Sequence, residues 1–331
     1  MKKRFCFLIG GILLLAACSS NKKSSQTIEV NKQSIQTLSD DGAWCWFTNP
    51  RAIYYSDDEI ITGWVKKDGS VEVASLNIES NEKAFNNLFP QMEVDDHNNP
   101  AFTVLPDGNI FTMYTWHSTK NGVVSNTTSN GSDINSFGEK VIFKPKTEEL
   151  LEKFPRETYT YANPYVLEEE GNKLFAFGRY TGFKPNLIIS DDNGKTWNEK
   201  YVVMSDIPFT PGNRPYVNYY SDGKSKIHMI FTDGHPRNEP LNSVYYCYYE
   251  KGAFWKIDGT KICNLEALPF HVTDASVVYK ASEEKGRAWI ADIVVKKDKP
   301  VILYSRHPEE TDHRYHYAWY NPKENKWEDY E

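Results

Sequence analysis

Four side chains suited to acid–base or anion chemistry stand at matching places in two neighbouring stretches of the sequence. His97 precedes a β-rich run and His117 follows the run that returns from it, and Tyr161 and Arg179 repeat this arrangement further along the chain. A histidine titrates near neutral pH, a tyrosine can pass a proton, and an arginine can hold a carboxylate. Together these groups suit proton transfer beside a negative charge.

A register argument brings the four side chains together in space. The turn at residues 106–108 joins two antiparallel runs, and the pairing that it sets places His97 opposite His117. In the next hairpin the same count places Tyr161 opposite Arg179. Each residue alone has a structural explanation, such as packing or a surface ion pair. Their coincident register in successive repeats favours a shared site.

The elements that carry these residues belong to an internal repeat. Helical periodicity is nearly absent, and short β-rich runs alternate with Asp, Gly and Asn turns. A unit of polar residue, proline, strand, tight turn and returning strand begins at Asn49, Asn99, Asn163 and Arg214, with a weaker copy from Asp274. Proline at the first strand position costs no ladder hydrogen bond. We predict an all-β fold, a single β-propeller of four-stranded antiparallel blades.

The repeat also places further polar residues on the same side of the predicted propeller. In such a fold, equivalent ends of equivalent strands converge on one mouth of the central channel. We therefore expect five more side chains to contact a substrate: Asn98, Asn163, Arg214, Tyr216 and Arg51.

Charge and cysteine content narrow the classes of partner. The net charge of −7 argues against nucleic acid, and an anionic substrate would need a local basic pocket. Beyond the N-terminal region, Cys45, Cys247 and Cys263 have no metal-finger spacing. We expect no metal, no cofactor and a monomer.

The N-terminus has the features of an export signal. Lys2, Lys3 and Arg4 precede a short apolar core that ends in small residues at about residue 17. The sequence LAAC, ending at Cys18, resembles a bacterial lipobox, so Cys18 is the expected lipidation site. We expect residues 1–17 to be the lipoprotein signal peptide, 18–38 the lipidated tether and 39–331 the folded domain. The lipid would hold that domain at a membrane of the bacterial cell envelope.

One short motif has a structural rather than a chemical meaning. The stretch SDDNGKTW, Ser190 to Trp197, resembles the Asp-box of sialidase-like propellers. In that motif the Asp and Gly residues build a hairpin turn and the Trp packs between strands. The match supports a propeller and says nothing about the reaction.

Longer motifs carry a family resemblance. The stretches DGAWCWFTNPRAIYY, DDHNNPAF, TYANPYVL, RPYVNYYSDGKSKIHMIFTDGHPR and DHRYHYAWY occur in order from about Ser39 to Glu331. Together they resemble the BNR-repeat (bacterial neuraminidase repeat) propeller proteins of polysaccharide-degrading systems. The resemblance implies seven blades and a relationship to ulvan lyases, which cleave a uronic-acid polysaccharide by β-elimination.

Carried over motif by motif, the resemblance implies that His97, His117, Tyr161 and Arg179 are catalytic. Arg179 and His117 would neutralise the uronate carboxylate, His97 or Tyr161 would take the proton, and Tyr161 would protonate the leaving oxygen. The expected partner is therefore an acidic polysaccharide or oligosaccharide.

Two other functions fit the same scaffold. Wider members of the family hydrolyse rhamnose–uronate linkages, and a non-catalytic glycan-binding propeller is also compatible with the sequence. A sialidase is not expected: the Asp-box is shared, but NPRAIYY stands in place of the Arg-Ile-Pro signature. Some relatives hold a structural zinc with histidine and cysteine. Here His235 and Cys247 could correspond, but Tyr249 stands at a neighbouring position, and two candidate ligands do not make a zinc site.

Overall fold

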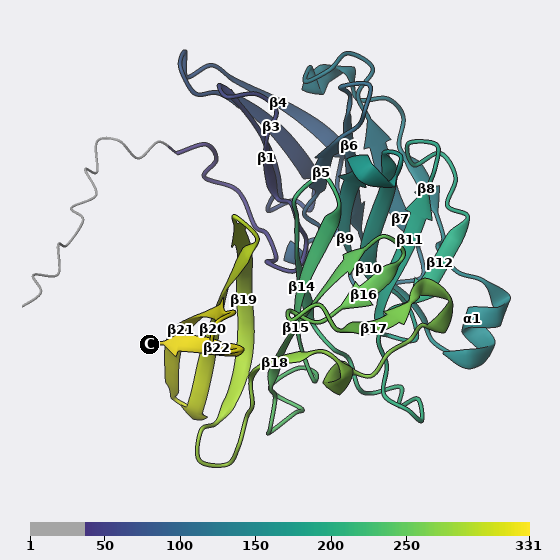
Figure 1. Ribbon diagram of the computed structural model, residues 1–331. Helices are drawn as coiled ribbons and strands as arrows, with labels where there is room; N and C mark the ends of the chain where they lie inside the picture. Colours follow the sequence, from purple (N-terminus) through teal and green to yellow (C-terminus); the bar gives the residue numbers. More distant parts are fainter. Residues whose placement is uncertain (1–36) are drawn as a thin grey trace, which may run out of the picture. The chain divides into compact units, whose positions relative to one another are not determined.

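Over residues 37–331 the chain forms five antiparallel β-sheets that follow one another along the sequence (Figure 1). The structure, a computed structural model, describes these residues, so the expected leader and Cys18 lie outside the described part. One short α-helix is present there, α1 (Glu148–Lys153). No helix in this range is long and apolar enough to cross a membrane. The all-β propeller class predicted from the sequence is confirmed.

Four of the five sheets have four strands each, hydrogen-bonded in chain order. The remaining sheet, the fourth along the chain, has six strands. The first three sheets contain β1 (Ala52–Tyr54), β2 (Glu59–Val65), β3 (Val71–Asn77) and β4 (Lys83–Phe89); β5 (Ala101–Val104), β6 (Ile110–Thr115), β7 (Val123–Thr127) and β8 (Val141–Phe143); and β9 (Glu157–Leu167), β10 (Lys173–Thr181), β11 (Pro185–Ser190) and β12 (Glu199–Val202). The last two contain β13 (Val217–Ser221), β14 (Lys226–Thr232), β15 (Val244–Glu250), β16 (Ala253–Trp255), β17 (Lys261–Asn264) and β18 (Ser276–Tyr279); and β19 (Arg287–Lys296), β20 (Lys299–Glu309), β21 (Asp312–Asn321) and β22 (Lys326–Tyr330).

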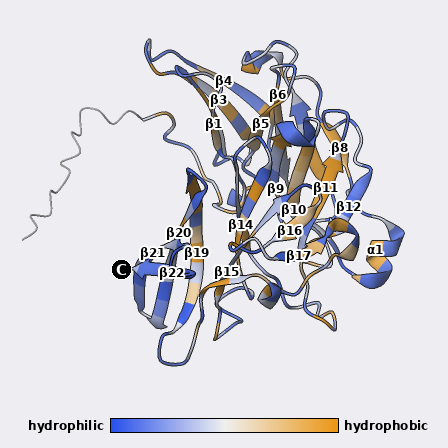
Figure 2. Cartoon of the chain, viewed as in Figure 1, coloured by the Kyte–Doolittle hydropathy of each residue, from blue (hydrophilic) through white to orange (hydrophobic). Residues whose placement is uncertain are grey.

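Most residues coloured as hydrophobic lie on strands, whereas the connecting loops and much of the last sheet are hydrophilic (Figure 2). Strand β6 is buried along its whole length, between neighbouring strands and sheets. Gly63 on β2 marks a close approach of the first two sheets, since a Cβ atom there would lie 2.5 Å from Cγ of Pro100. The sheets are therefore packed face against face, as blades of a propeller must be.

The first strand of every sheet faces a shared cavity of about 520 Å³. Its lining includes one residue from each of these strands: Ala52, Thr103, Tyr165, Tyr219 and Asp292. Five first strands around one hollow are the centre of a propeller.

The first four repeat copies each form the first two strands of one sheet. The weaker copy from Asp274 first supplies β18 of the fourth sheet and then forms β19 and β20, the first two strands of the fifth. The count of seven blades, which rested on the family resemblance, is not confirmed, because residues 37–331 form five sheets. The physical reason is length: a complete sheet with its loops uses the whole interval from one repeat copy to the next.

The Asp-box joins β11 to β12 and has the structural role expected of it. The Asp192 carboxylate accepts hydrogen bonds from the backbone N–H and the hydroxyl of Thr196, at 2.8 and 2.6 Å. The Trp197 ring stacks on Phe143 of β8, with ring centroids 5.4 Å apart. The motif thus fixes a turn of the third sheet and packs that sheet on the second.

Candidate active site

His97 and His117 meet at the end of the β5–β6 hairpin. The ladder has the predicted register, with Ala101 paired to Met113, but it ends there. His97 lies beyond it in a 3-10 helix, Asp96–Asn98, rather than in a strand. The two imidazole rings are nevertheless stacked, with centroids 3.8 Å apart and planes inclined by 11°.

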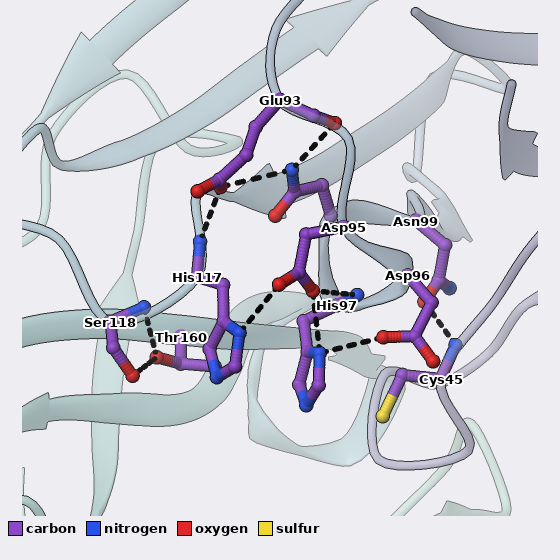
Figure 3. A network of polar contacts seen from close by, with 10 residues as sticks. Cys45, Glu93, Asp95, Asp96, His97, Asn99, His117, Ser118 and Thr160 are labelled. Carbon is purple, nitrogen blue, oxygen red and sulfur yellow. Dashed lines mark hydrogen bonds and ion pairs between the residues drawn. The ribbon is translucent and has the colours of Figure 1, made fainter. Parts of the chain in front are cut away.

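A single carboxylate orients both rings (Figure 3). Asp95 Oδ1 lies 2.6 Å from Nδ1 of His97, and Oδ2 lies 2.7 Å from Nδ1 of His117. Asp96 also contacts the His97 ring, at 2.7 Å from Nδ1. Because an ionised carboxylate only accepts hydrogen bonds, the Nδ1 atoms carry protons, which leaves Nε2 of each ring as the atom that can accept a proton.

Replacing Asp95 with Asn should lower turnover roughly 10²-fold or more, because the amide can accept from one ring only and forces the other into the wrong tautomer. Burial alone would raise the pKa of Asp95, but hydrogen bonds from the His97 backbone and the His117 ring hold it below its ordinary 3.8. A depressed pKa stabilises the fold above pH about 4, and that stabilisation is lost below it. The Tm difference between wild type and D95N should therefore shrink from pH 6 to pH 3; a constant difference would contradict this account.

A second carboxylate holds the His117 backbone. Glu93 Oε2 accepts from the His117 N–H at 2.9 Å and from Nδ2 of Asn98 at 3.1 Å. Asn98 is fully buried. Its amide therefore fixes Glu93 behind the two rings, whereas the sequence suggested a substrate contact.

Tyr161 reaches the site through a β-bulge. The β9–β10 register holds as predicted up to Phe177, which pairs with Asn163, and then shifts, so that Arg179 pairs with Thr160 instead of Tyr161. The backbone φ of Tyr161 is +66°, a left-handed conformation that non-glycine residues seldom adopt. The bulge turns the phenol toward the imidazoles, and the Tyr161 and His97 ring centroids are 5.6 Å apart.

Burial sets the protonation of this phenol. Tyr161 is 6 % exposed, and burial raises its pKa well above the ordinary value of 10, against the opposing effect of the Arg179 charge. The phenol therefore keeps its proton at neutral pH. It can donate that proton, but it is a poor base.

The second and third sheets are joined beside the site. Thr119 and Tyr159 form an isolated bridge, and the Ser118 N–H donates to the Thr160 hydroxyl at 2.9 Å. Ser118 also has a left-handed φ, +54°. These contacts hold His117 next to the bulge, so two histidines and a tyrosine from adjacent sheets meet in one place.

Three arginines surround one phenyl ring at the edge of this site. The guanidinium carbons of Arg156, Arg179 and Arg214 lie 3.7, 4.9 and 5.3 Å from the Phe183 ring centroid. Arg179 is 5 % exposed; it donates to the Pro215 carbonyl at 3.4 Å, and its Nε has no hydrogen-bond partner. Among residues 37–331 none of the three forms an ion pair with a carboxylate. These three arginines and Phe183, the arginine cluster, are a local concentration of positive charge of the kind that an anionic ligand needs in an acidic protein.

Tyr216 connects the arginines to an aromatic wall. Its ring centroid lies 4.4 Å from the Arg179 guanidinium, 4.9 Å from the Trp289 ring and 5.4 Å from the His235 ring. Burial, together with the charges of Arg214, Arg237 and Arg179, lowers the pKa of His235 to about 4. His235 is therefore neutral at pH 7, chiefly because it is buried and further because positive charges lie near it.

Two predicted substrate contacts lie elsewhere in the structure. Asn163 is buried; its Oδ1 accepts from the Asn49 N–H at 2.7 Å and its Nδ2 donates to the Phe177 carbonyl at 3.2 Å. Arg51 lines the central cavity, and its guanidinium lies 4.5 Å from the Trp44 ring. The Asn163 amide is thus used within the fold, while Arg51 faces the hollow between the first strands.

Metal-type donors converge at one place in the described range. Ligand atoms of Asp95, His97 and His117 lie within 4.8 Å of one another and could hold a divalent cation. His235 and Cys247 belong to no such group among residues 37–331, and Cys247 is buried in a hydrophobic core.

The sequence did not predict that Arg156 and Phe183 belong to the arginine cluster or that Trp289 packs on Tyr216 beside it. Arg156 precedes β9 and Phe183 lies in the β10–β11 turn, outside the aligned positions of the repeat. A positive φ of +61° at Phe183 reflects that tight turn, and Gly182 before it was the available sequence signal.

Comparisons with known proteins agree with this architecture. The profile of a family described as "BNR repeat-containing family member" matches residues 60–331. A PL25 ulvan lyase bound to -[GlcA(1-4)Rha3S]- superposes with a TM-score of 0.67 at 12 % identity, over 89 % of this chain and 74 % of that chain. Polysaccharide lyase Uly1 superposes with a TM-score of 0.60 at 12 % identity, over 90 % and 76 %. At this identity the likeness concerns the fold. No curated protein matches the sequence.

Proposed function

The chain belongs to the BNR repeat-containing family, and from that premise we propose that it is a polysaccharide lyase that cleaves a uronic-acid-containing glycan by β-elimination. The single observation that carries the proposal is the meeting of a carboxylate-oriented histidine pair, a protonated buried phenol and an arginine without an ionic partner in the described chain. The similarity in fold to the PL25 ulvan lyase and to polysaccharide lyase Uly1 also supports the proposal.

Arg179 would first bind the uronate carboxylate. The negative charge of that group makes C5 a poor acid, and a buried cation beside it stabilises the charge that develops when the C5 proton leaves. His117 can assist in the form that also carries a proton on Nε2, because its ring lies against that of His97 and is held through Nδ1 by Asp95. The neighbouring charges of Arg156 and Arg214 favour an anionic sugar over a neutral one.

His97 suits the role of base and Tyr161 that of acid. Nε2 of His97 takes the C5 proton, the C5–H electrons form the C4–C5 double bond, and the C4–O4 bond breaks. Tyr161 gives its proton to the departing oxygen, which releases a chain end and leaves an unsaturated uronate on the other fragment. The proton then returns from His97 to Tyr161 through solvent. The raised pKa of Tyr161 supports this assignment, since a phenol that keeps its proton has one to give to the leaving oxygen.

The test is incubation with a panel of uronate-containing glycans, followed by the ultraviolet absorbance of the unsaturated product. A carboxyl-reduced form of each active polymer is the matched control and should not be cleaved. His97→Ala should lower turnover by about 10²–10⁴-fold while leaving the affinity for the glycan nearly unchanged.

The other outcomes identify the alternative functions. Shorter fragments without the chromophore would show hydrolysis, and elimination would then be wrong. Tight binding without any fragments, equal in wild type and H97A, would indicate a glycan-binding propeller.

Binding of an acidic oligosaccharide should raise the pKa of His235 from about 4, because the ligand's negative charge offsets the arginines that now oppose protonation of the ring. Proton NMR titration of the histidine ring signals measures this shift. His228 is the internal control: its pKa is also lowered to about 4, by burial, and its ring bonds the Tyr246 hydroxyl. A neutral oligosaccharide that raised the His235 pKa equally would contradict an anion pocket.

A further inference from the structure

A buried lysine outside the proposed chemistry is next in sequence to Phe183, the ring of the arginine cluster, and is influenced by the charge of Arg179. Lys184 follows Phe183 in the β10–β11 turn, and its side chain is fully buried. Its ammonium contacts four oxygen atoms: Asp206 Oδ1 at 2.6 Å, the Thr210 carbonyl at 3.0 Å, and the Asn213 carbonyl and Oδ1 at 2.6 and 3.2 Å. An ammonium group has three protons, so these contacts use its full donor capacity.

All four oxygen atoms belong to one segment, residues 206–213, which connects β12 to β13 without regular structure. Much of this segment is exposed, from Ile207 to Gly212. A flexible surface loop would ordinarily sample many conformations. Here the buried ammonium of Lys184 holds four oxygen atoms of the loop around one point, as a bound metal ion would.

The residues next in sequence to Lys184 and to Asn213 belong to the arginine cluster. Phe183, on which the three guanidinium groups lie, precedes Lys184, and Arg214 follows Asn213. The Pro215 carbonyl, one residue further, accepts the hydrogen bond from Arg179. Lys184 thereby fixes the distance between the phenyl ring and two of its arginines, although like charges side by side repel.

The ion pair with Lys184 also determines whether the Asp206 carboxylate is free to bind an arginine. Asp206 is the ionic partner of Lys184, and Lys184 also senses the charge of Arg179. Without Lys184 the Asp206 carboxylate would lose its counter-ion and be free to pair with arginines that have no ionic partner among residues 37–331. It would then compete with an anionic ligand for them.

We propose that Lys184 is a positioning residue for anion recognition: its ammonium pins the segment 206–213 and occupies Asp206, so that Arg179 and Arg214 remain open to an acidic sugar. This inference rests on the proposed function, because it concerns the same arginine cluster. It assigns to Lys184 an effect on affinity for acidic glycans, beyond an effect on folding.

The test uses the full chain with Lys184→Met, which keeps the length of the side chain and removes its charge. At a temperature where the variant is folded, its Kd for an acidic uronate oligosaccharide should be at least about 10-fold weaker than that of wild type. Lys184→Met combined with Asp206→Asn should recover part of this loss, because the Asp206 carboxylate can no longer compete with the ligand. The matched control is Lys146→Met, since Lys146 pairs with Glu157 at 3.4 Å and is partly exposed; it should bind as wild type does.

A lower Tm with an unchanged Kd in K184M would show a purely structural lysine and overturn the inference. If K184M does not fold, Asn213→Ala removes an anchor next to Arg214 and leaves the Lys184–Asp206 pair in place. Unchanged affinity in N213A would overturn the inference equally. Failure of wild type to bind any acidic glycan would instead defeat the proposed function, so the two failures are distinguishable.

Discussion

Tyr161→Phe should lower kcat on a uronate glycan by about 10²–10⁴-fold and leave the affinity for that glycan nearly unchanged. The substitution removes the hydroxyl alone. The ring contacts with His97, at 5.6 Å, and with the Arg179 guanidinium, at 5.2 Å, can persist. The loss should therefore reflect the missing proton donor, and steady-state kinetics with a direct binding measurement separates the two quantities.

The matched control for this variant lies two residues earlier on the same strand. Tyr159 is also buried, and its hydroxyl donates to Glu157 at 2.8 Å, away from the imidazoles. Tyr159→Phe should keep kcat within a few-fold of wild type. Equal losses in Y159F and Y161F would mean that the phenol of Tyr161 has no special part in the reaction.

Arg179→Met should change activity and stability in opposite directions. The expected loss in kcat/KM is about 10²–10³-fold, because the cation that stabilises the developing charge is gone. The free energy of unfolding should rise by about 1 kcal/mol or more, because a buried charge without an ionic partner costs desolvation energy that a hydrophobic side chain does not. Arg179 is 5 % exposed and lies near two other guanidinium groups, so its burial is costly in the free protein.

Chemical denaturation and kinetics on the same preparations test this pair of effects. Arg287→Met is the control, because Arg287 has a carboxylate partner, Glu310. It should leave kcat/KM unchanged. An Arg179→Met variant that was both less stable and fully active would contradict the anion-site interpretation and leave Arg179 as a packing residue.

The sequence predicts the hairpins well where a turn fixes their register. The Pro-Asp-Gly turn at 106–108 sets the β5–β6 pairing, and the structure has that pairing. The bulge at Tyr161 could not be predicted, because the alternating pattern around it continues unchanged and the extra residue becomes visible only through the shifted pairing of Arg179. Local sequence thus predicts pairing, while interruptions depend on the neighbouring sheet.

The composition of the site was harder to predict than its location. Asn98 and Asn163 have the polarity of substrate contacts, yet their amides satisfy Glu93, Asn49 and the Phe177 carbonyl. In contrast, Arg156 gave no motif, because its place beside Phe183 results from packing between distant segments. Buried polar groups need partners inside the fold, and a sequence alone does not say which partners these will be.

The extra residue in β9 gives the chemistry an unusual dependence on strand length. Side chains alternate between the two faces of a strand, so deleting Ala162 would remove the first of the two register shifts in this ladder and turn Tyr161 toward the other face. The phenol of Tyr161 would then point away from the imidazoles while the strands of the sheet stayed paired. We expect such a deletion to leave the fold intact and to abolish the proposed activity, although His97, His117, Tyr161 and Arg179 would all still be present.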